Sequence, residues 1–275
     1  MVKYDIIMQN KIRGKIMPTN VNVKLIRKEE LKPDIFKFTC ESKEISNNAK
    51  PGQFVEIKVS ESYEPFLRRP ISIYNADKDN NLFEFIFQVK GRGTNFLSNI
   101  KEGEFIDIIG PIGRGTFEIK DYKNIAIIGG GIGIFPLYEL TKEAKLCANT
   151  NVYLGFRNKD FVVLEDEFRK VSTNLTITTD DGSYGENGFA INYLEKDLEE
   201  KNIDAIYACG PLPMLKAVKK LAEDKKIFCQ ISLEQRMACG VGACMGCSVK
   251  LATEEVHYAR VCKDGPVFDC DAVEI

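Results

Sequence analysis

The sequence has few of the features that mark several common classes of protein. It holds one histidine, His257, and a Rieske iron-sulfur centre is excluded because it needs two. We expect His257 to be a surface or loop residue. The 38 Lys and Arg residues are balanced by 40 Asp and Glu residues, so the net charge of -2 provides no basic field for nucleic acid. Any recognition of phosphate must therefore be local.

Long apolar runs are also missing. Residues 1–15 contain no apolar core of the kind that a signal peptide needs. The most apolar stretch, residues 125–137, is interrupted by glycines and is shorter than the roughly 20 residues of a membrane-spanning helix. We therefore expect a cytoplasmic protein without a membrane segment.

Short strand-like segments fill the N-terminal part of the chain. They are rich in β-branched and aromatic residues, turn signals separate them, and they fall at residues 21–25, 35–39, 54–59, 71–74, 82–89 and 105–109. This pattern predicts an antiparallel β-barrel or sandwich over residues 21–120. An extension, residues 1–20, precedes it, and we assign that extension no function.

Strands and helices alternate in the next part of the chain. Buried-strand runs occur at residues 125–128, 151–156, 175–179 and 205–209, with helical segments up to residue 146 and near 190–200 and 213–224. The alternation predicts an α/β domain with a mostly parallel sheet over residues 121–227. Residues 228–275 are dense in Cys and Gly without a clear period, which predicts a small cofactor module.

Four cysteines of this tail have the spacing of an iron-sulfur site. The run CGVGACMGC holds Cys239, Cys244 and Cys247, and Cys262 follows farther along the chain. C-x4-C-x2-C with a distant fourth cysteine is the plant-type [2Fe-2S] pattern. A zinc site is the alternative, but four-cysteine zinc sites usually use two short C-x2-4-C pairs, and only one such pair exists here.

Glycines separate the clustered cysteines. A loop that wraps a cluster must aim backbone N–H groups at sulfur through conformations that side chains obstruct. We expect Gly240, Gly242 and Gly246 to supply that freedom. The cysteines to which we assign no role, as buried or structural thiols, are Cys40, Cys147, Cys229 and Cys270.

Two loops of the α/β region are candidates for binding a nucleotide. The run GGGIGIFP, residues 129–136, follows a strand and leads into a helix, so its N–H groups can approach a phosphate. Its spacing departs from G-x-G-x-x-G, and a tight turn would also explain it. A second loop, Cys209-Gly210-Pro211, ends a later strand at the sheet edge where open α/β sheets bind ligands.

Two segments of the predicted barrel are candidates for binding an anion. Arg69 precedes Pro70-Ile71-Ser72 on a strand, and Gly91-Arg92-Gly93-Thr94 opens a helical stretch at residues 95–100. Arg69 can pair with a pyrophosphate, and a helix start at Gly93 and Thr94 can present N–H groups. Taken singly, Arg69 would be a surface charge and Thr94 a helix N-cap.

Together these segments resemble the ferredoxin-reductase superfamily. The motifs are RRPIS, GRGT, GGGIGIFP, TDDGSYGENGF, ACGPLPML and the four-cysteine tail, in that order over residues 20–275. The chain is most similar to the electron-transfer subunits of class 1B dihydroorotate dehydrogenase. That resemblance implies an FAD-binding barrel (21–120), an NAD-binding α/β domain (121–227) and a [2Fe-2S] module (228–275).

The resemblance also implies the binding residues. The FAD site falls on Arg69, Pro70, Ile71, Ser72, Ile86, Phe87, Gln88, Gly93 and Thr94, with Ile71 where the superfamily has a tyrosine. The nicotinamide site falls on Gly130, Gly131, Gly133, Gly210 and Pro211, and Cys209 is the candidate catalytic residue. The cluster ligands are Cys239, Cys244, Cys247 and Cys262.

The implied function is electron transfer in pyrimidine biosynthesis. Electrons would pass from an FMN-containing dihydroorotate dehydrogenase subunit through the cluster and FAD to NAD, in a heterotetramer of two copies of each chain. A hydride carries two electrons and a [2Fe-2S] cluster accepts one, so FAD is the required converter. We expect an oxidoreductase subunit that does not oxidise dihydroorotate alone.

Two other functions compete with this interpretation. One is the small subunit of another NAD(P)H-dependent ferredoxin oxidoreductase, and the other is an iron-sulfur redox sensor without turnover. The sensor needs no nicotinamide site, so the two nucleotide loops count against it. The choice between NAD and NADP is open, because Arg157 can bind a 2'-phosphate while Glu165 or Asp166 can bind a 2'-hydroxyl.

Overall fold

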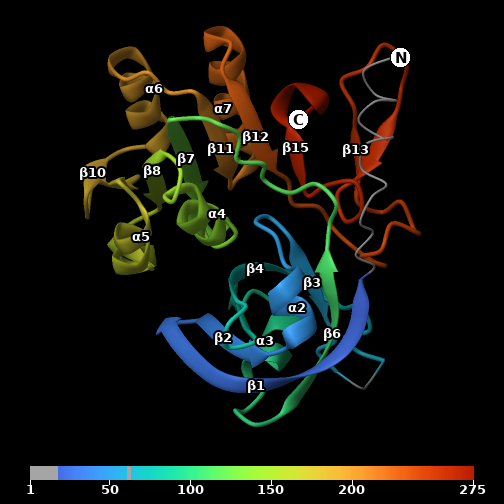
Figure 1. Cartoon of the computed structure of the whole chain (residues 1–275). Coiled ribbons are helices and arrows are strands. Elements are labelled where there is room, and N and C mark those ends of the chain that lie inside the picture. Colours follow the sequence, from blue (N-terminus) through green and yellow to red (C-terminus); the bar gives the residue numbers. More distant parts are fainter. Residues whose placement is uncertain (1–17, 61–62) are drawn as a thin grey trace.

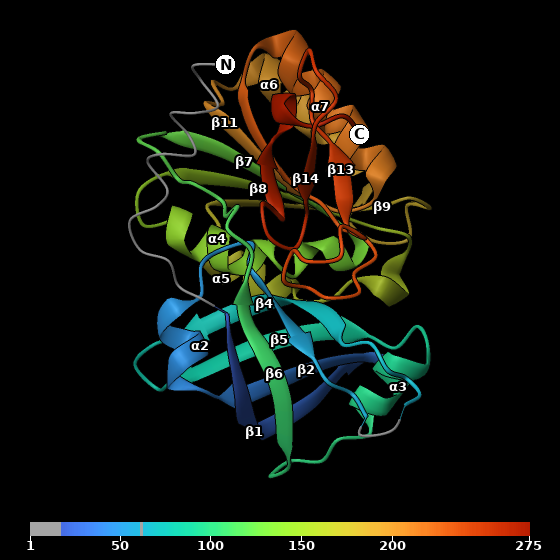
Figure 2. The ribbon, with the colours of Figure 1, turned by 90° about the vertical axis from the view of Figure 1, so that its right-hand side faces the viewer.

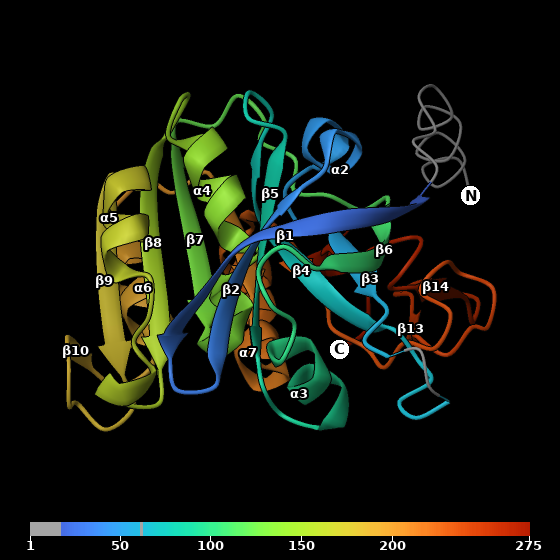
Figure 3. The ribbon, with the colours of Figure 1, turned by 90° about the horizontal axis from the view of Figure 1, so that it is seen from below.

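A computed structural model describes residues 18–60 and 63–275 of the chain. Of the predicted extension, residues 1–17 lie outside the described residues. The molecule has a barrel at one end, and a parallel sheet and a cysteine-containing module both rest on it (Figure 1). The view from below the barrel places the sheet and the module on opposite sides of it (Figure 3).

Six antiparallel strands close into the barrel in the order β1-β2-β5-β4-β3-β6. Their bounds are β1 Thr19–Lys32, β2 Ile35–Glu41, β3 Phe54–Ile57, β4 Arg69–Asp77, β5 Leu82–Gln88 and β6 Phe105–Ile112, with α2 Lys43–Asn48 and α3 Arg92–Ser98 between strands. Alternate residues point inward, and the fully buried rings of Phe38, Phe83 and Phe85 fill the interior. The predicted antiparallel barrel is confirmed.

The second part is a seven-stranded sheet in the order β10-β9-β8-β7-β11-β12-β15, parallel except between β12 and β15. The strands are β7 Asn124–Gly130, β8 Asn149–Phe156, β9 Asn174–Thr179, β10 Glu186–Asn187, β11 Ala205–Cys209, β12 Phe228–Ser232 and β15 Val267–Asp269. Its helices are α4 Leu137–Ala144, α5 Glu165–Val171, α6 Ala190–Glu200 and α7 Leu212–Lys225, with 3-10 turns η1 Gly131–Ile134 and η2 Lys159–Phe161. Parallel strands covered on both faces are apolar throughout, and β7 and β11 are buried almost entirely. The predicted α/β sheet is confirmed.

Residues 233–275 form the cysteine-containing module, here called the C-terminal module. It contains a short hairpin, β13 Ser248–Lys250 with β14 Tyr258–Arg260, and ends in β15 and η3 Cys270–Ala272. Because β15 pairs with β12, the module is part of the large sheet at one edge and packs above the barrel (Figure 2). The exposed His257 lies in this module and pairs only with Glu255 among the described residues, as expected for a surface residue.

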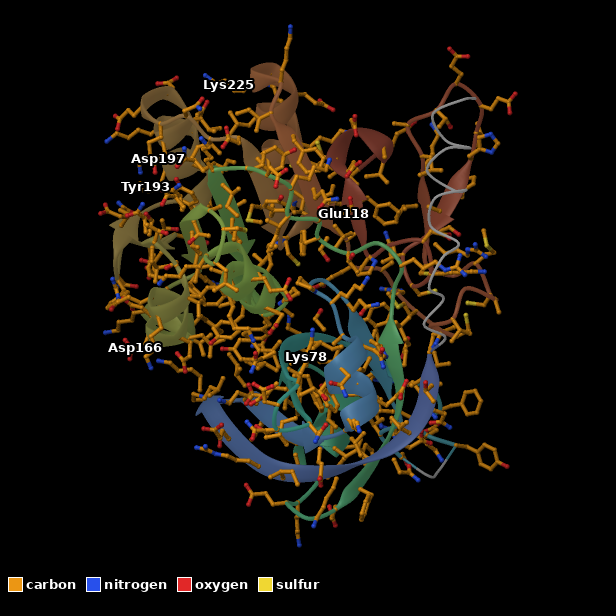
Figure 4. The ribbon with its side chains drawn as sticks, in the orientation of Figure 1. Lys78, Glu118, Asp166, Tyr193, Asp197 and Lys225 are labelled. Carbon is orange, nitrogen blue, oxygen red and sulfur yellow. The ribbon has the colours of Figure 1, made fainter. Side chains whose placement is uncertain are left out.

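Several contacts fix the sheet on the barrel. Tyr74 of β4 stacks on Tyr138 of α4 with ring centroids 4.4 Å apart, and Ala76 N–H donates to the Glu139 carboxylate at 3.1 Å. The connector between the two parts carries Glu118, whose carbonyl accepts from the Tyr207 hydroxyl at 2.9 Å (Figure 4). These contacts hold helix α4 on strand β4 and the connector on strand β11. None of the helices among the described residues is long and apolar enough to cross a membrane.

Candidate functional site

A cavity of about 250 Å³ lies where barrel strands β4 and β5 face the sheet. Eight residues predicted from the sequence line it: Pro70, Ile71, Ser72, Ile86, Phe87, Gln88, Thr94 and Cys209. They come from two barrel strands, from α3 and from the end of β11. The fold therefore brings together segments that are more than a hundred residues apart in the sequence.

Arg69 and Gly93 meet beside this cavity. A Cβ atom added to Gly93 would collide with the Arg69 guanidinium, so the missing side chain makes room for that group. The guanidinium donates to the backbone carbonyls of Leu67 and Arg68, and no carboxylate among the described residues forms an ion pair with it. A half-exposed cation without an acidic partner at a helix start suits a phosphate group.

Helix α3 begins earlier than the sequence suggested. It starts at Arg92 with Gly91 at the N-cap, so the predicted start at residue 95 and the alternative of Thr94 as N-cap are wrong. The Thr94 hydroxyl instead accepts from the N–H groups of Lys90 and Gly91, at 2.9 and 3.2 Å. Because the N-cap residue is glycine, no side chain caps the start of the helix. The hydroxyl of Thr94 instead stabilises the turn that precedes the helix.

A second cavity, of about 810 Å³, lies at the carboxyl ends of the sheet strands. The predicted residues that line it are Gly130, Gly131, Gly133, Gly210 and Pro211. The two loops are in direct contact, because a Cβ on Gly133 would lie 2.5 Å from the Gly210 Cα and 2.7 Å from the Cys209 carbonyl oxygen. Only glycine permits this approach. The pairing of β7 with β11 places both loops at one sheet edge, as predicted.

The two cavities adjoin each other. They share the lining residues Gln88, Lys90, Ile132, Phe135, Leu233, Glu234 and Gln235. Cys209 is buried at this junction, and burial, followed by the charge of Glu234, raises the pKa of its thiol well above the ordinary value against a hydrogen bond with Ser232. Cys209 is therefore a neutral thiol at physiological pH.

Sequence reasoning missed the residues that follow β12. Leu233, Glu234 and Gln235 line both cavities, and Lys90 faces them from the end of β5. The signal was their position, since they begin directly after a parallel strand of the sheet, where ligands bind. The predicted module at residues 228–275 includes β12, and no parallel strand is expected from the sequence there.

The four predicted cluster cysteines interact with one another. The Cys244 N–H group donates to the Cys239 sulfur and the Cys262 N–H group donates to the Cys247 sulfur, each at 3.4 Å, and Cys239 and Cys262 interact electrostatically. Cys244 is exposed and Cys239 is partly exposed, whereas Cys247 and Cys262 are buried. Among residues 18–60 and 63–275, no three His, Cys, Asp or Glu side chains converge as they would on a single metal ion.

The loop around these cysteines suits a sulfur-ligated cluster. Ala243 and Cys244 donate N–H bonds to the Cys239 sulfur at 3.2 and 3.4 Å, and Gly246 donates to Cys244 at 3.4 Å. Burial opposes ionisation of Cys239, but these backbone donors outweigh it and lower its pKa to about 6. Thiolates, not thiols, bind iron, so the donor set fits a cluster.

Two of the three predicted loop glycines need their flexibility. Gly240 and Gly242 have φ of 64° and 82°, in the left-handed region. Gly246 does not adopt the left-handed conformation, which falls on the preceding Met245 with φ of 60°, but its N–H group points at the Cys244 sulfur as expected.

A buried carboxyl group lies between the cluster loop and the barrel. Glu56 of β3 is 1% exposed, and neither carboxyl oxygen has a hydrogen-bond partner among the described residues. Gly240 rests on it so closely that an added Cβ would lie 2.5 Å from the Glu56 Cγ. Phe54, two residues earlier on the same face of β3, lines the smaller cavity. Glu56 thus lies between that cavity and the cysteines.

Three family models match successive parts of the chain. The oxidoreductase FAD-binding domain matches residues 22–117, and the oxidoreductase NAD-binding domain matches residues 127–220. The iron-sulfur cluster binding domain of dihydroorotate dehydrogenase B matches residues 234–274. A curated relative from Lysinibacillus sphaericus, a dihydroorotate dehydrogenase B (NAD(+)) electron transfer subunit, is 41% identical over 90% of this chain and 95% of its own. The chain belongs to this family of electron transfer subunits.

Other relatives agree with this family. The electron transfer subunit from Fusobacterium nucleatum is 42% identical over 90% of this chain and 95% of its own. Among solved structures, an NADH-dependent reduced ferredoxin-NADP oxidoreductase superposes with a TM-score of 0.82 at 32% identity, covering 96% of this chain and 91% of that one. A ferredoxin reductase of carbazole 1,9a-dioxygenase, at 21% identity and a TM-score of 0.67, shares the fold. The chain is thus an FAD, NAD and iron-sulfur oxidoreductase subunit of the dihydroorotate dehydrogenase B family.

The contact between Gly133 and Gly210 provides a test of the larger cavity. We expect Gly133→Ala to weaken NADH binding by roughly 10-fold or more, because its methyl group would force apart two backbone loops that have no flexible atoms to move. Titration of NADH against flavin absorbance would measure the affinity. Gly91→Ala is the control, since a Cβ on Gly91 would meet nothing within 4 Å and Gly91 does not line the larger cavity. Equal losses in the two variants would contradict the role of loop contact.

Glu56 gives a prediction about pH. Burial raises its pKa to about 7, with Cys239 adding to the rise and Arg68 and Arg69 opposing it. An acid whose pKa is higher in the folded state destabilises that state as pH rises above the unfolded value. Between about pH 4.5 and 7 the fold should lose about 3 kcal/mol through this group.

We therefore expect Glu56→Gln to remove this loss. Urea unfolding of the cofactor-loaded protein should give a smaller stability difference between pH 5 and pH 8 in the variant than in the wild type. Glu30→Gln changes an exposed residue of β1 and is the control. An unchanged pH dependence in Glu56→Gln would show that the carboxyl group finds a donor in the loaded protein.

Proposed function

We propose that this chain passes electrons between an FMN-containing dihydroorotate dehydrogenase subunit and NAD, through its [2Fe-2S] cluster and FAD, in pyrimidine biosynthesis. The observation that carries the proposal is that the three sites are neighbours. The larger cavity adjoins the smaller one, and the cluster loop rests on the barrel strand that also lines the smaller one.

Each site has its own proposed residues. We propose that Arg69, Ser72, Gly93 and Thr94 hold FAD, with Pro70, Ile71, Ile86, Phe87 and Gln88 along its ring system. Gly130, Gly131, Gly133, Gly210 and Pro211 would hold NAD, and Cys239, Cys244, Cys247 and Cys262 the cluster. When bound, FAD exchanges two electrons with a nicotinamide and single electrons with a cluster. The protein's task is to hold these groups near one another and to exclude water.

Cys209 is the proposed catalytic residue at the junction of the cavities. Its buried neutral thiol can pack against the place where nicotinamide and flavin rings meet, without competing as a nucleophile. Phe135, almost fully buried, closes the same junction from the sheet side. Both residues would therefore position rings and keep the contact dry.

NAD is the proposed dinucleotide. The relatives are named NAD(+) enzymes, and the resemblance favoured NAD. Arg157 lines the larger cavity, whereas Glu165 is already engaged by Arg169 at 2.6 Å and by the Tyr184 hydroxyl at 2.7 Å. Of the two acidic candidates for the 2'-hydroxyl, Asp166 is thus the one with fewer side-chain partners.

The domain division at residues 120 and 227 stays a prediction.

The proposed partner is the dehydrogenase catalytic subunit, in a cytoplasmic heterotetramer of two copies of each chain. Relatives named as electron transfer subunits support a catalytic partner. The exposed Cys244 is flanked by exposed Val241 and Met245, an apolar surface that suits a protein contact near the cluster. Electrons would leave or enter through this face.

A reconstitution tests the function. The isolated chain should reduce artificial dyes with NADH but should not oxidise dihydroorotate. Addition of an FMN-containing dihydroorotate dehydrogenase subunit should give dihydroorotate-dependent reduction of NAD. If the two proteins do not associate while NADH still bleaches the flavin, the related NADH-dependent ferredoxin oxidoreductase function becomes the better explanation. If NADH does not bleach the flavin, a redox sensor would be favoured.

A further inference from the structure

Cys229 of β12 and Cys270 of η3, which have no role in the proposed electron path, lie close to each other. In the antiparallel ladder between β12 and β15, Gln230 pairs with Asp269 and Ile231 pairs with Phe268. Cys229 and Cys270 are the next residues beyond the end of this ladder, and Cys270 begins η3. A disulfide bridges Cα atoms about 4.4–6.8 Å apart, a span that residues beside a paired antiparallel position can reach.

The two thiols already influence each other. Both cysteines are free, and each shifts the pKa of the other. They are 3% and 5% exposed, and Cys270 lies in η3 between the exposed residues Asp269 and Asp271.

The surroundings of the two thiols differ. Lys219 of α7 donates to the carbonyls of Cys270 and Val273, at 2.6 and 2.8 Å, and so lies beside Cys270. The Cys229 hydrogen bond and the Lys219 charge outweigh burial and the nearby acids and lower the pKa of Cys270. The pKa of Cys229 is raised by the same hydrogen bond and by burial. Cys270 is therefore the better nucleophile of the pair.

We propose that Cys229 and Cys270 form a dithiol site that exchanges with small-molecule disulfides of the glutathione type. The Cys270 thiolate attacks one sulfur of the disulfide, which releases one thiolate and leaves a mixed disulfide. Cys229 then loses its proton and attacks the Cys270 sulfur, and the second thiol leaves. The protein loses two electrons and two protons, and the small disulfide becomes two thiols.

A disulfide between Cys229 and Cys270 would cross-link strand β12 to η3 at the end of the C-terminal module. The new bond would enclose residues 230–269, the segment that contains all four cluster cysteines. A cross-link at the two ends of this segment restricts its unfolding, even when the cluster has been lost. Cytosolic disulfides are usually transient and redox-responsive, so the site would protect the C-terminal module during oxidative conditions.

Peptide mapping of the intact, cofactor-loaded chain tests the proposal. The protein is equilibrated anaerobically with oxidised and reduced glutathione at a series of ratios, and free thiols are blocked before digestion. We expect a peptide that joins Cys229 to Cys270. The exposed Cys147 should form a mixed disulfide and report that oxidant is active, whereas the fully buried Cys40, without a thiol partner, should stay reduced.

Two variants separate the roles of the thiols. Cys229→Ser should leave one glutathione trapped on Cys270, because no second thiol can displace it. Cys270→Ser should leave Cys229 unmodified. The proposal fails if Cys229 and Cys270 both stay reduced at ratios that modify Cys147, or if Cys229 alone is modified in Cys270→Ser. Neither result depends on a dehydrogenase partner, so the proposed electron path is tested separately.

Discussion

Replacement of Cys262 by Ser should abolish electron transfer between the dehydrogenase partner and NAD. Cys262 is the fourth predicted ligand, 1% exposed, and its N–H group donates to the Cys247 sulfur at 3.4 Å. Mutation of residues that only hydrogen-bond to a metal ligand lowers metal affinity roughly 10- to 100-fold. Removal of a buried ligand itself should lower the affinity for the cluster further. Dihydroorotate-dependent NAD reduction should therefore fall by more than about 100-fold.

Reduction of dyes by NADH separates loss of the cluster from loss of the fold. The barrel and the sheet supply most of the lining of both cavities, so dye reduction and FAD content should be largely retained in Cys262→Ser. Cys244→Ser should show the same pattern, and Cys147→Ser, an exposed cysteine of the sheet domain, should change neither activity. Iron and acid-labile sulfide should be present in the wild type. Zinc without sulfide, or coupled turnover in protein without a cluster, would refute the electron path.

Replacement of Arg69 by Ala should empty the flavin site. Charge-assisted hydrogen bonds contribute about 1.5–3 kcal/mol each, so FAD affinity should fall roughly 10- to 100-fold. Arg69 is suited to this contact because its guanidinium lies at the start of α3 without an acidic partner among the described residues. Flavin absorbance after dialysis measures occupancy. Full retention would show that Arg69 is a surface charge only.

The neighbouring residues provide matched controls. Arg68 points elsewhere and pairs with Asp107 of β6 at 2.9 Å, so Arg68→Ala should lower stability without lowering flavin affinity. Gly93→Ala should weaken FAD binding in the same direction as Arg69→Ala, because the added methyl group displaces the guanidinium. A Cβ added to Gly91 would meet no atom within 4 Å, so Gly91→Ala should leave FAD affinity unchanged. An effect at Gly91 equal to that at Gly93 would argue against displacement of Arg69.

The elements that the sequence predicted well have a clear apolar pattern. Helix α6 and strand β11 have the predicted bounds, Ala190–Glu200 and Ala205–Cys209, because their apolar periodicity is clear. Helices α2 and α5 were missed, since each is a short segment held by its packing on the barrel or sheet. The start of α3 was also misplaced, because Gly91 carries no capping side chain that could be read from the sequence.

The sequence by itself determined the chemistry that depends on local spacing. The spacing of Cys239, Cys244 and Cys247 predicts an iron-sulfur cluster, and the glycines after β7 predict a dinucleotide. Each motif is a short loop, and a short loop can bind a ligand in only a few ways. The tertiary structure alone decided which distant side chains meet. The pairing of β12 with β15 brought Cys229 close to Cys270, and the packing of the cluster loop on β3 buried Glu56 beneath Gly240. Such contacts depend on how strands pair and loops pack across the whole chain, and no local pattern in the sequence encodes them.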